Sequence, residues 1–150
     1  MNQSANTFFI ATLLFIFSSF SFAGEQYTKR GYAVSGYDPV AYFTTGKPTK
    51  GDKNISAEWN DAKWIFATEE HKNLFLANPE KYAPAYDGHC AFAAGIGKKV
   101  SAKPTLWKII DDRLFLNFSK AANTRWLDNP ESYIKDGDDN WKELSQEPAA

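Results

Sequence analysis

Residues 1–23 contain no aspartate, glutamate, lysine or arginine, so every charged residue of the 150-residue chain lies after them. The segment includes an apolar run from Phe8 to Phe17, which is too short for the roughly 20 residues that span a bilayer. Ser21 and Ala23 then place small residues at the two positions that a signal peptidase recognises. We therefore expect a secretory signal peptide over 1–23, cleaved after Ala23, with an uncleaved membrane anchor as the alternative.

Cleavage would leave residues 24–150 as the mature protein. We expect this protein to be located in the periplasm or to be secreted. This length corresponds to one domain. A single cysteine excludes an internal disulfide and a zinc site built from paired cysteines. The formal net charge of -1 argues against a nucleic-acid partner, whose phosphates require a basic surface. After cleavage no stable membrane insertion is expected, and no protein partner can be predicted.

Two pairs of apolar, aromatic-containing runs predict antiparallel hairpins. The first pair, 55–59 and 63–67, flanks a turn at 60–62, and the second pair, 106–110 and 114–118, turns at 111–113. Thr68 and Ser119 directly follow the hairpins and are expected to cap helices, the first of them over 69–77. The sequence thus predicts an α+β fold, a small single domain of short antiparallel hairpins packed with short helices. No internal repeat is recognised in it.

Proline pairs predict the remaining helix starts. Asp38-Pro39 begins a short helix that ends before Gly46, and Asn78-Pro79 begins another that ends near Tyr82. After Asn129-Pro130 the apolar pattern predicts further helical segments, broken near Gly137.

Three stretches of the chain resemble the YHS domain family. Residues 64–82 (WIFATEEHKNLFLANPEKY) match its most recognisable run, and residues 36–43 (GYDPVAYF) fit its opening. Residues 86–93 (YDGHCAFA) are similar to the exported branch, whose members are mostly uncharacterised YHS domain-containing proteins. The similarity covers about 32–141, with 24–150 as the whole mature domain. It implies the fold of the family and does not imply an activity.

Metal-binding members of that family carry cysteines where this chain has Ala41, Ala67 and His71, so the resemblance does not imply a thiolate site there. His71 should share an inward helix face with Leu74 and Phe75. Either a semi-buried histidine bonded to backbone or a ligand or proton-transfer group is compatible with that position.

Cys90, preceded by His89, is the other candidate. Small residues follow it and predict a helix start, where free amides lower a thiol pKa. An accessible thiolate of this kind binds soft metals or reacts with disulfides and peroxide. The resemblance adds that some exported relatives have selenocysteine at the matching position. The alternative is a buried cysteine that packs as a small hydrophobe.

These residues support three hypotheses. The first is a non-catalytic module that binds a metal ion or small molecule near Cys90, with His89 and His71 as further metal ligands, and with Tyr86 and Tyr37 lining a ligand pocket. Copper or zinc would suit such ligands, although no cofactor is identified. The second is a thiol-redox protein that uses Cys90, and the third a structural or interaction domain. No catalytic triad, carboxylate pair or nucleotide motif is apparent, so an enzyme is not favoured.

Overall fold

The computed structural model describes residues 24–150, and the expected signal peptide over 1–23 lies outside the described residues. The described part has the predicted α+β fold, with short antiparallel hairpins and short helices. In chain order its elements are β1 (Thr28–Lys29), β2 (Tyr32–Ala33), the 3-10 helix η1 (Val34–Gly36), α1 (Ala41–Thr44), β3 (Asp52–Trp59), β4 (Ala62–Phe66), α2 (Glu69–Ala77), α3 (Pro79–Tyr82), the 3-10 helix η2 (Ala85–Gly88), α4 (Ala91–Gly95), β5 (Lys103–Ile110), β6 (Arg113–Asn117), α5 (Lys120–Asp128) and α6 (Pro130–Leu144).

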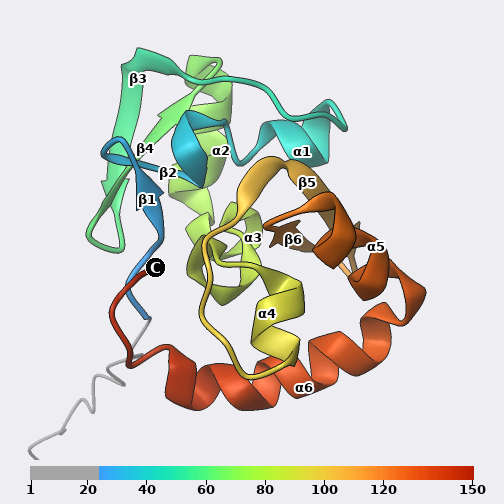
Figure 1. Ribbon diagram of the computed structural model, residues 1–150. Coiled ribbons are helices and arrows are strands. Elements are labelled where there is room, and N and C mark those ends of the chain that lie inside the picture. Colours follow the sequence, from blue (N-terminus) through green and yellow to red (C-terminus); the bar gives the residue numbers. More distant parts are fainter. Residues whose placement is uncertain (1–23) are drawn as a thin grey trace, which may run out of the picture.

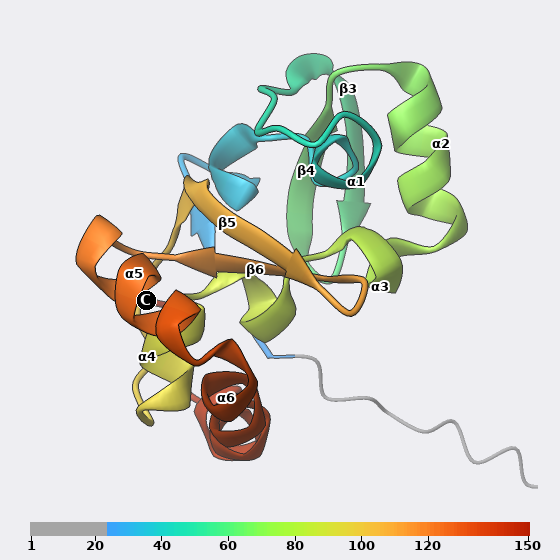
Figure 2. The ribbon, with the colours of Figure 1, turned by 90° about the vertical axis from the view of Figure 1, so that its right-hand side faces the viewer.

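The two longer hairpins lie in different parts of the molecule (Figure 1). The β3–β4 hairpin carries α2 on one side, whereas β5–β6 crosses the middle of the molecule and α6 runs beneath α4. Figure 2 shows β5–β6 between the β3–β4 and α2 part above and the α5 and α6 part below. The chain end at Ala150 returns to the first strands, where the Ala149 amide donates to Glu25 Oε2 at 3.0 Å.

Both predicted hairpins are confirmed, and both turn through two residues with positive φ. Asn60 and Asp61 have φ values of 50° and 53°, and Asp111 and Asp112 have 49° and 58°. Asparagine and aspartate tolerate this left-handed backbone better than other residues with side chains, and such turns match the twist of paired strands.

The structure contains an internal repeat, contrary to the sequence-based expectation. In the first hairpin Asp52 pairs with Phe66 and Trp59 with Ala62. In the second hairpin Lys103 pairs with Asn117 and Ile110 with Arg113. Each residue of the second hairpin therefore lies 51 positions after its counterpart in the first. The register shift recurs at the same place in both hairpins. Each hairpin is followed by a capped helix, an Asn-Pro pair and a second helix.

Few residues are identical between the two halves, which is why the sequence conceals the repeat. Equivalent positions pack in the same way with different residues: Trp64 packs on Phe75 with ring centroids 4.8 Å apart, and Phe115 packs on Trp126 at 5.2 Å. The strand carries the tryptophan and the helix the phenylalanine in the first half, and the reverse holds in the second half.

The predicted helix caps are confirmed. Thr68 accepts a hydrogen bond from the His71 amide, and Ser119 accepts one from the Ala122 amide. The predicted break near Gly137 is wrong, because α6 continues through it to Leu144. A Cβ at Gly137 would lie 2.7 Å from the Tyr86 hydroxyl, so this glycine allows close packing and does not end the helix.

The core consists of two clusters. The first centres on Trp64, Phe66 and Phe75 of the first half and also includes Leu114 and Leu116 of β6, and the second centres on Phe115 and Trp126. Leu74 was expected to face this core with Phe75, but it is 36% exposed, because α2 buries only a narrow stripe. Within residues 24–150 we find no helix with the length and apolar character needed to cross a membrane.

Candidate functional site

Cys90 lies where the sequence predicts, at the N-cap of α4, but it is only 1% exposed. Its Sγ accepts a hydrogen bond from the Phe118 amide at 3.3 Å and lies 3.5 Å from Asn117 Oδ1. Burial raises the pKa of the thiol, and the nearby backbone amides only partly oppose that effect. The expectation of a lowered thiol pKa is therefore wrong, because desolvation outweighs the helix amides.

The internal repeat shows what Cys90 does in the fold. In the hydrogen bonding of the first half its place is taken by Asp38, 52 positions earlier, whose Oδ1 accepts from the Val40 amide at 2.9 Å and whose Oδ2 accepts from the Ala67 amide at 2.8 Å. In the second half Asn117 Oδ1 accepts from the Phe92 amide at 2.9 Å, while Cys90 Sγ accepts from the Phe118 amide.

One carboxylate in the first half is thus replaced by two side chains, a thiol and an amide, in the second. Both arrangements fix the start of a short helix to the end of a strand. Cys90 therefore takes part in local hydrogen bonding as well as packing, in agreement with the structural hypothesis for this residue.

His89 is adjacent to Cys90 in sequence but lies in different surroundings. It is fully buried, with its ring 5.5 Å from the Tyr27 ring and 5.4 Å from the Trp141 ring. Nδ1 donates to the Tyr86 carbonyl at 3.0 Å, and Nε2 accepts from the Ala150 amide at 3.2 Å. Burial lowers the pKa of His89 to about 4, so the ring is neutral at pH 7 and both nitrogens are occupied.

His71 belongs to a third location, in the first half. Its Nδ1 donates to Asp38 Oδ2 at 2.6 Å, and its Nε2 lies 3.1 Å from Thr44 Oγ1. This Asp-His-hydroxyl order was not anticipated, since nothing in the sequence indicated that these residues meet. The Thr44 hydroxyl also donates to the Val40 carbonyl, and Asp38 is occupied by backbone amides, so the array ties α1 to α2.

The three predicted metal ligands, Cys90, His89 and His71, are therefore each engaged in separate hydrogen-bond networks. Among residues 24–150, no group of three or more histidine, cysteine, aspartate or glutamate side chains is arranged to hold a metal ion.

The burial of Cys90 leads to a kinetic prediction. Alkylation of the native protein by iodoacetamide should be slow at pH 7 to 9 and should accelerate only when denaturant unfolds the domain, because the reactive species is an exposed thiolate. The measurement is labelling rate against denaturant concentration, with the urea-unfolded protein as the reference for full reactivity. Rapid labelling of the folded protein near pH 7 would contradict this prediction and would support the thiol-redox hypothesis.

A surface cleft of about 550 Å³ lies where the two halves meet the C-terminal part of α6. Its walls come from the N-terminal residues Gly24 and Gln26, from the end of β3, from α3 and the segment after it, from η2, from the β5–β6 turn and from α6. Aromatic and charged side chains dominate the lining, which includes Trp59, Tyr86, Trp141, Glu80, Lys81, Asp87, Asp112, Arg113, Asp138 and Lys142.

Tyr86 connects the wall of this cleft to its charged groups. Its hydroxyl donates to Asp138 Oδ1 at 3.0 Å, and Arg113 binds both oxygens of the same carboxylate, at 2.8 and 2.9 Å. Burial, and then the Asp138 charge, raise the pKa of Tyr86, so the phenol stays protonated. Although burial acts in the opposite direction, Arg113 holds the pKa of Asp138 below its usual value.

The two predicted ligand-binding tyrosines are separated by the structure. Tyr86 lines the cleft, whereas Tyr37 is half-buried against the first core cluster and pairs with Lys50. Arg113 and Asp138 were not predicted, because they lie in a strand and a helix that the sequence presents as ordinary polar positions. Only their opposite charges, 25 residues apart, are visible in the sequence.

Comparison with known proteins finds no matching family model, curated protein or solved structure.

Proposed function

We propose that this chain is a non-catalytic binding module that holds a small organic molecule in the cleft beside Tyr86. The observation that carries the proposal is the lining of that cleft, where the aromatic rings of Trp59, Tyr86 and Trp141 lie among charged groups of both signs. Small-molecule sites combine apolar surface with a few polar groups that fix orientation. The expected ligand has a flat apolar part and carries both a cationic and an anionic group.

The charge pattern supports a zwitterionic ligand. Lys81, Arg113 and Lys142 provide positive charge, and Glu80, Asp87, Asp112 and Asp138 provide negative charge, along the same walls. Arg113 and Asp138 are 42% and 44% exposed as side chains, so their ion pair faces the cleft and can exchange partners with a ligand. Rigid aromatic surfaces offer stacking at little cost in side-chain entropy.

Tyr86 and Asp87, the first two residues of the stretch that resembles the exported YHS branch, line the cleft. The proposed ligand lies beside Tyr86 in the cleft and not beside Cys90, which is buried in the core. A thiol-redox role finds no support in the surroundings of Cys90, and a purely structural role is the outcome if no ligand binds.

The tryptophan indole N–H resonances test the location of binding. The chain has five tryptophans: Trp59 and Trp141 line the cleft, Trp107 lines a separate hollow, and Trp64 and Trp126 are buried. We expect millimolar phenylalanine, a zwitterion with a flat ring, to shift the Trp141 and Trp59 indole resonances and leave the other three unchanged. Phenethylamine and phenylpropionate, which each lack one charge, should produce smaller shifts.

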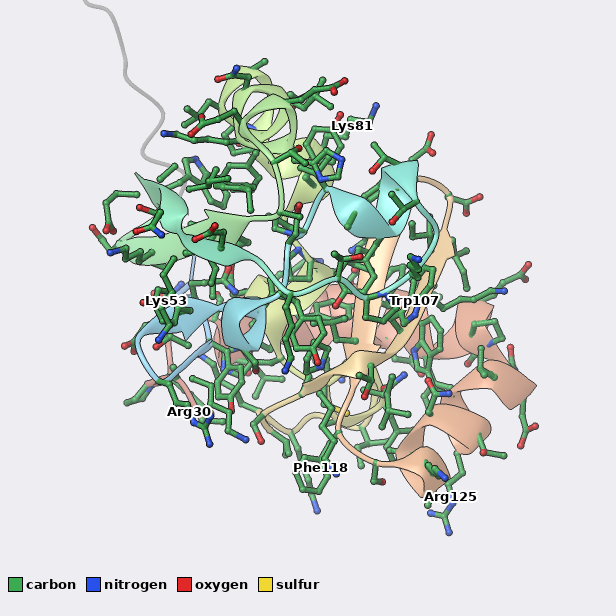
Figure 3. The ribbon with its side chains drawn as sticks, turned by 90° about the horizontal axis from the view of Figure 1, so that it is seen from above. Arg30, Lys53, Lys81, Trp107, Phe118 and Arg125 are labelled. Atoms are coloured by element: carbon green, nitrogen blue, oxygen red, sulfur yellow. The ribbon has the colours of Figure 1, made fainter. Side chains whose placement is uncertain are left out.

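Arg113→Ala should lower the apparent affinity for phenylalanine, measured from these shifts, about tenfold or more. The substitution removes a charge-assisted contact worth about 1.5–3 kcal/mol. Arg125→Ala is the matched control, since Arg125 extends outward from α5, away from the cleft (Figure 3). Shifts centred on Trp107, or equal effects of the two variants, would contradict the cleft as the site. Absence of any shift with all three probes would favour the structural hypothesis.

A further inference from the structure

We propose that Gly24, once cleavage after Ala23 makes it the first residue of the chain, docks its α-ammonium against the half-buried carboxylate of Asp87. Hydrolysis of the Ala23–Gly24 peptide bond consumes one water and leaves a carboxylate on Ala23 and an ammonium on Gly24. Asp87 would then be a binding site for the new N-terminus. Gly24 and Asp87 both line the cleft described above, but the inference does not depend on any ligand bound there.

Gly24 is packed tightly against Asp87. It is buried, and a Cβ at this position would collide with the Asp87 carboxylate and lie 2.9 Å from both Cβ and the backbone oxygen of Ser145. The Gly24 backbone acts to lower the pKa of the Asp87 carboxyl, against the effect of its burial. A side chain larger than that of glycine would not fit without a shift of Asp87 and Ser145.

The residues that follow Gly24 are fixed to the same segment. The Tyr27 amide and the Gln26 side-chain amide both donate to the Asp87 carbonyl, each at 2.8 Å. Because Gln26 is also buried, the first residues of the processed chain form a strap over η2 and do not extend freely into solvent. The position of the Gly24 nitrogen is therefore determined by the fold.

Asp87 lacks a close cation of its own among the described residues. Its Oδ2 accepts a hydrogen bond from Trp141 Nε1 at 3.2 Å. Lys99 Nζ lies over the ring of the same tryptophan, 5.3 Å from its centroid. Burial raises the pKa of Asp87, and these partners only partly oppose that effect. A half-buried carboxylate whose hydrogen-bond donors are neutral is favoured in its charged form by a cation at hydrogen-bond distance.

Other charged groups near this site have their own partners or lie further away. Glu25, next in the chain, accepts from the Ala149 amide, and Arg113, which lines the same cleft as Asp87, is engaged with Asp138. Lys142 of α6 pairs with Asp139. A peptide N–H at Gly24 gives Asp87 a neutral hydrogen bond, whereas an α-ammonium gives it a full positive charge. Cleavage would therefore change the charge at this site without moving the backbone.

The test compares two chains that differ by one residue, one beginning at Gly24 and one retaining Ala23, each with Asp87 and with Asp87→Asn. We expect retention of Ala23 to raise the unfolding equilibrium constant about tenfold, which corresponds to a shift of about one unit in the amine pKa. In the Asp87→Asn background the two chains should be equally stable. Glu25→Gln is the matched control, since it removes a neighbouring exposed carboxylate and should leave the tenfold difference intact.

A second measurement uses the Asp87 protein alone and holds even if Asp87→Asn fails to fold. NMR titration of the ¹⁵N-labelled Gly24 amine should show a pKa above the ordinary range of about 7.7–8.0. The added stability would be present below that range and would be lost as pH rises through the higher folded value. An amine that titrates at its ordinary value, or an equal effect of Ala23 in both backgrounds, would overturn the proposal.

Discussion

Asp38→Ala should lower the free energy of unfolding by about 3–5 kcal/mol. The Asp38 carboxylate is fully buried and accepts hydrogen bonds from the amides of Val40, Ala41 and Ala67 and from the His71 ring. Alanine removes every acceptor at once and leaves buried donors without partners, which is more costly than the loss of an exposed hydrogen bond.

Chemical denaturation measures this loss, and a fall of roughly 10 °C in Tm should accompany it. Asp128→Ala is the matched control, because Asp128 is exposed on α5 and should change stability by less than about 0.5 kcal/mol. Asp38→Asn, which keeps one acceptor oxygen, should fall between the two and provides a value if the alanine variant does not fold. A loss below about 1 kcal/mol for Asp38→Ala would show that the Asp38 network is not structural.

The sequence predicted the elements of this fold better than their relationship. Hairpins, caps and the Asn-Pro starts depend on neighbouring residues, so local chemistry is enough to identify them. The repeat was missed because it preserves geometry through different residues, as where Asp38 corresponds to Cys90 and Phe66 to Asn117. The strand registers show that Phe66 and Asn117 are equivalent, and the hydrogen bonds to the following amides show that Asp38 and Cys90 are.

The site was less predictable, for a related reason. The sequence shows that Cys90 begins a helix, which favours a reactive thiolate, but it does not show how deeply the surrounding strands bury the sulfur. Tyr86 was identified, whereas Arg113 and Asp138 were not, since their pairing depends on how α6 packs against α4 and Tyr86. Gly137 allows the close approach of α6 to Tyr86, although in the sequence it indicated the end of a helix.

The equivalence of the two halves leads to a second large effect. Cys90→Asp places a carboxylate in the position that corresponds to Asp38, beside the Phe118 amide, but without an imidazole. The residue that corresponds to His71, 51 positions later, is Ala122. We expect Cys90→Asp alone to lose about 3–5 kcal/mol at pH 7, because it buries an unpaired charge.

The pH dependence of that loss has a definite sign. An unpaired buried carboxyl has a raised pKa, so its folded form prefers the proton. The destabilisation should therefore be small where the carboxyl is protonated in both states, below about pH 4, and should grow as pH rises. Urea denaturation of Cys90→Asp and of the parent protein between pH 4 and 8 measures the difference.

Adding Ala122→His to Cys90→Asp should restore more than about 1 kcal/mol, because it recreates the pair found between Asp38 and His71. The control is Ala121→His in the same background, since Ala121 lies one residue earlier on α5, is exposed and has no such counterpart. A complete double-mutant cycle isolates the coupling from the effect of histidine on the helix. Equal recovery at 121 and 122 would contradict the equivalence of the two sites, whereas recovery at 122 alone would show that the second half still accepts the hydrogen-bond network of the first.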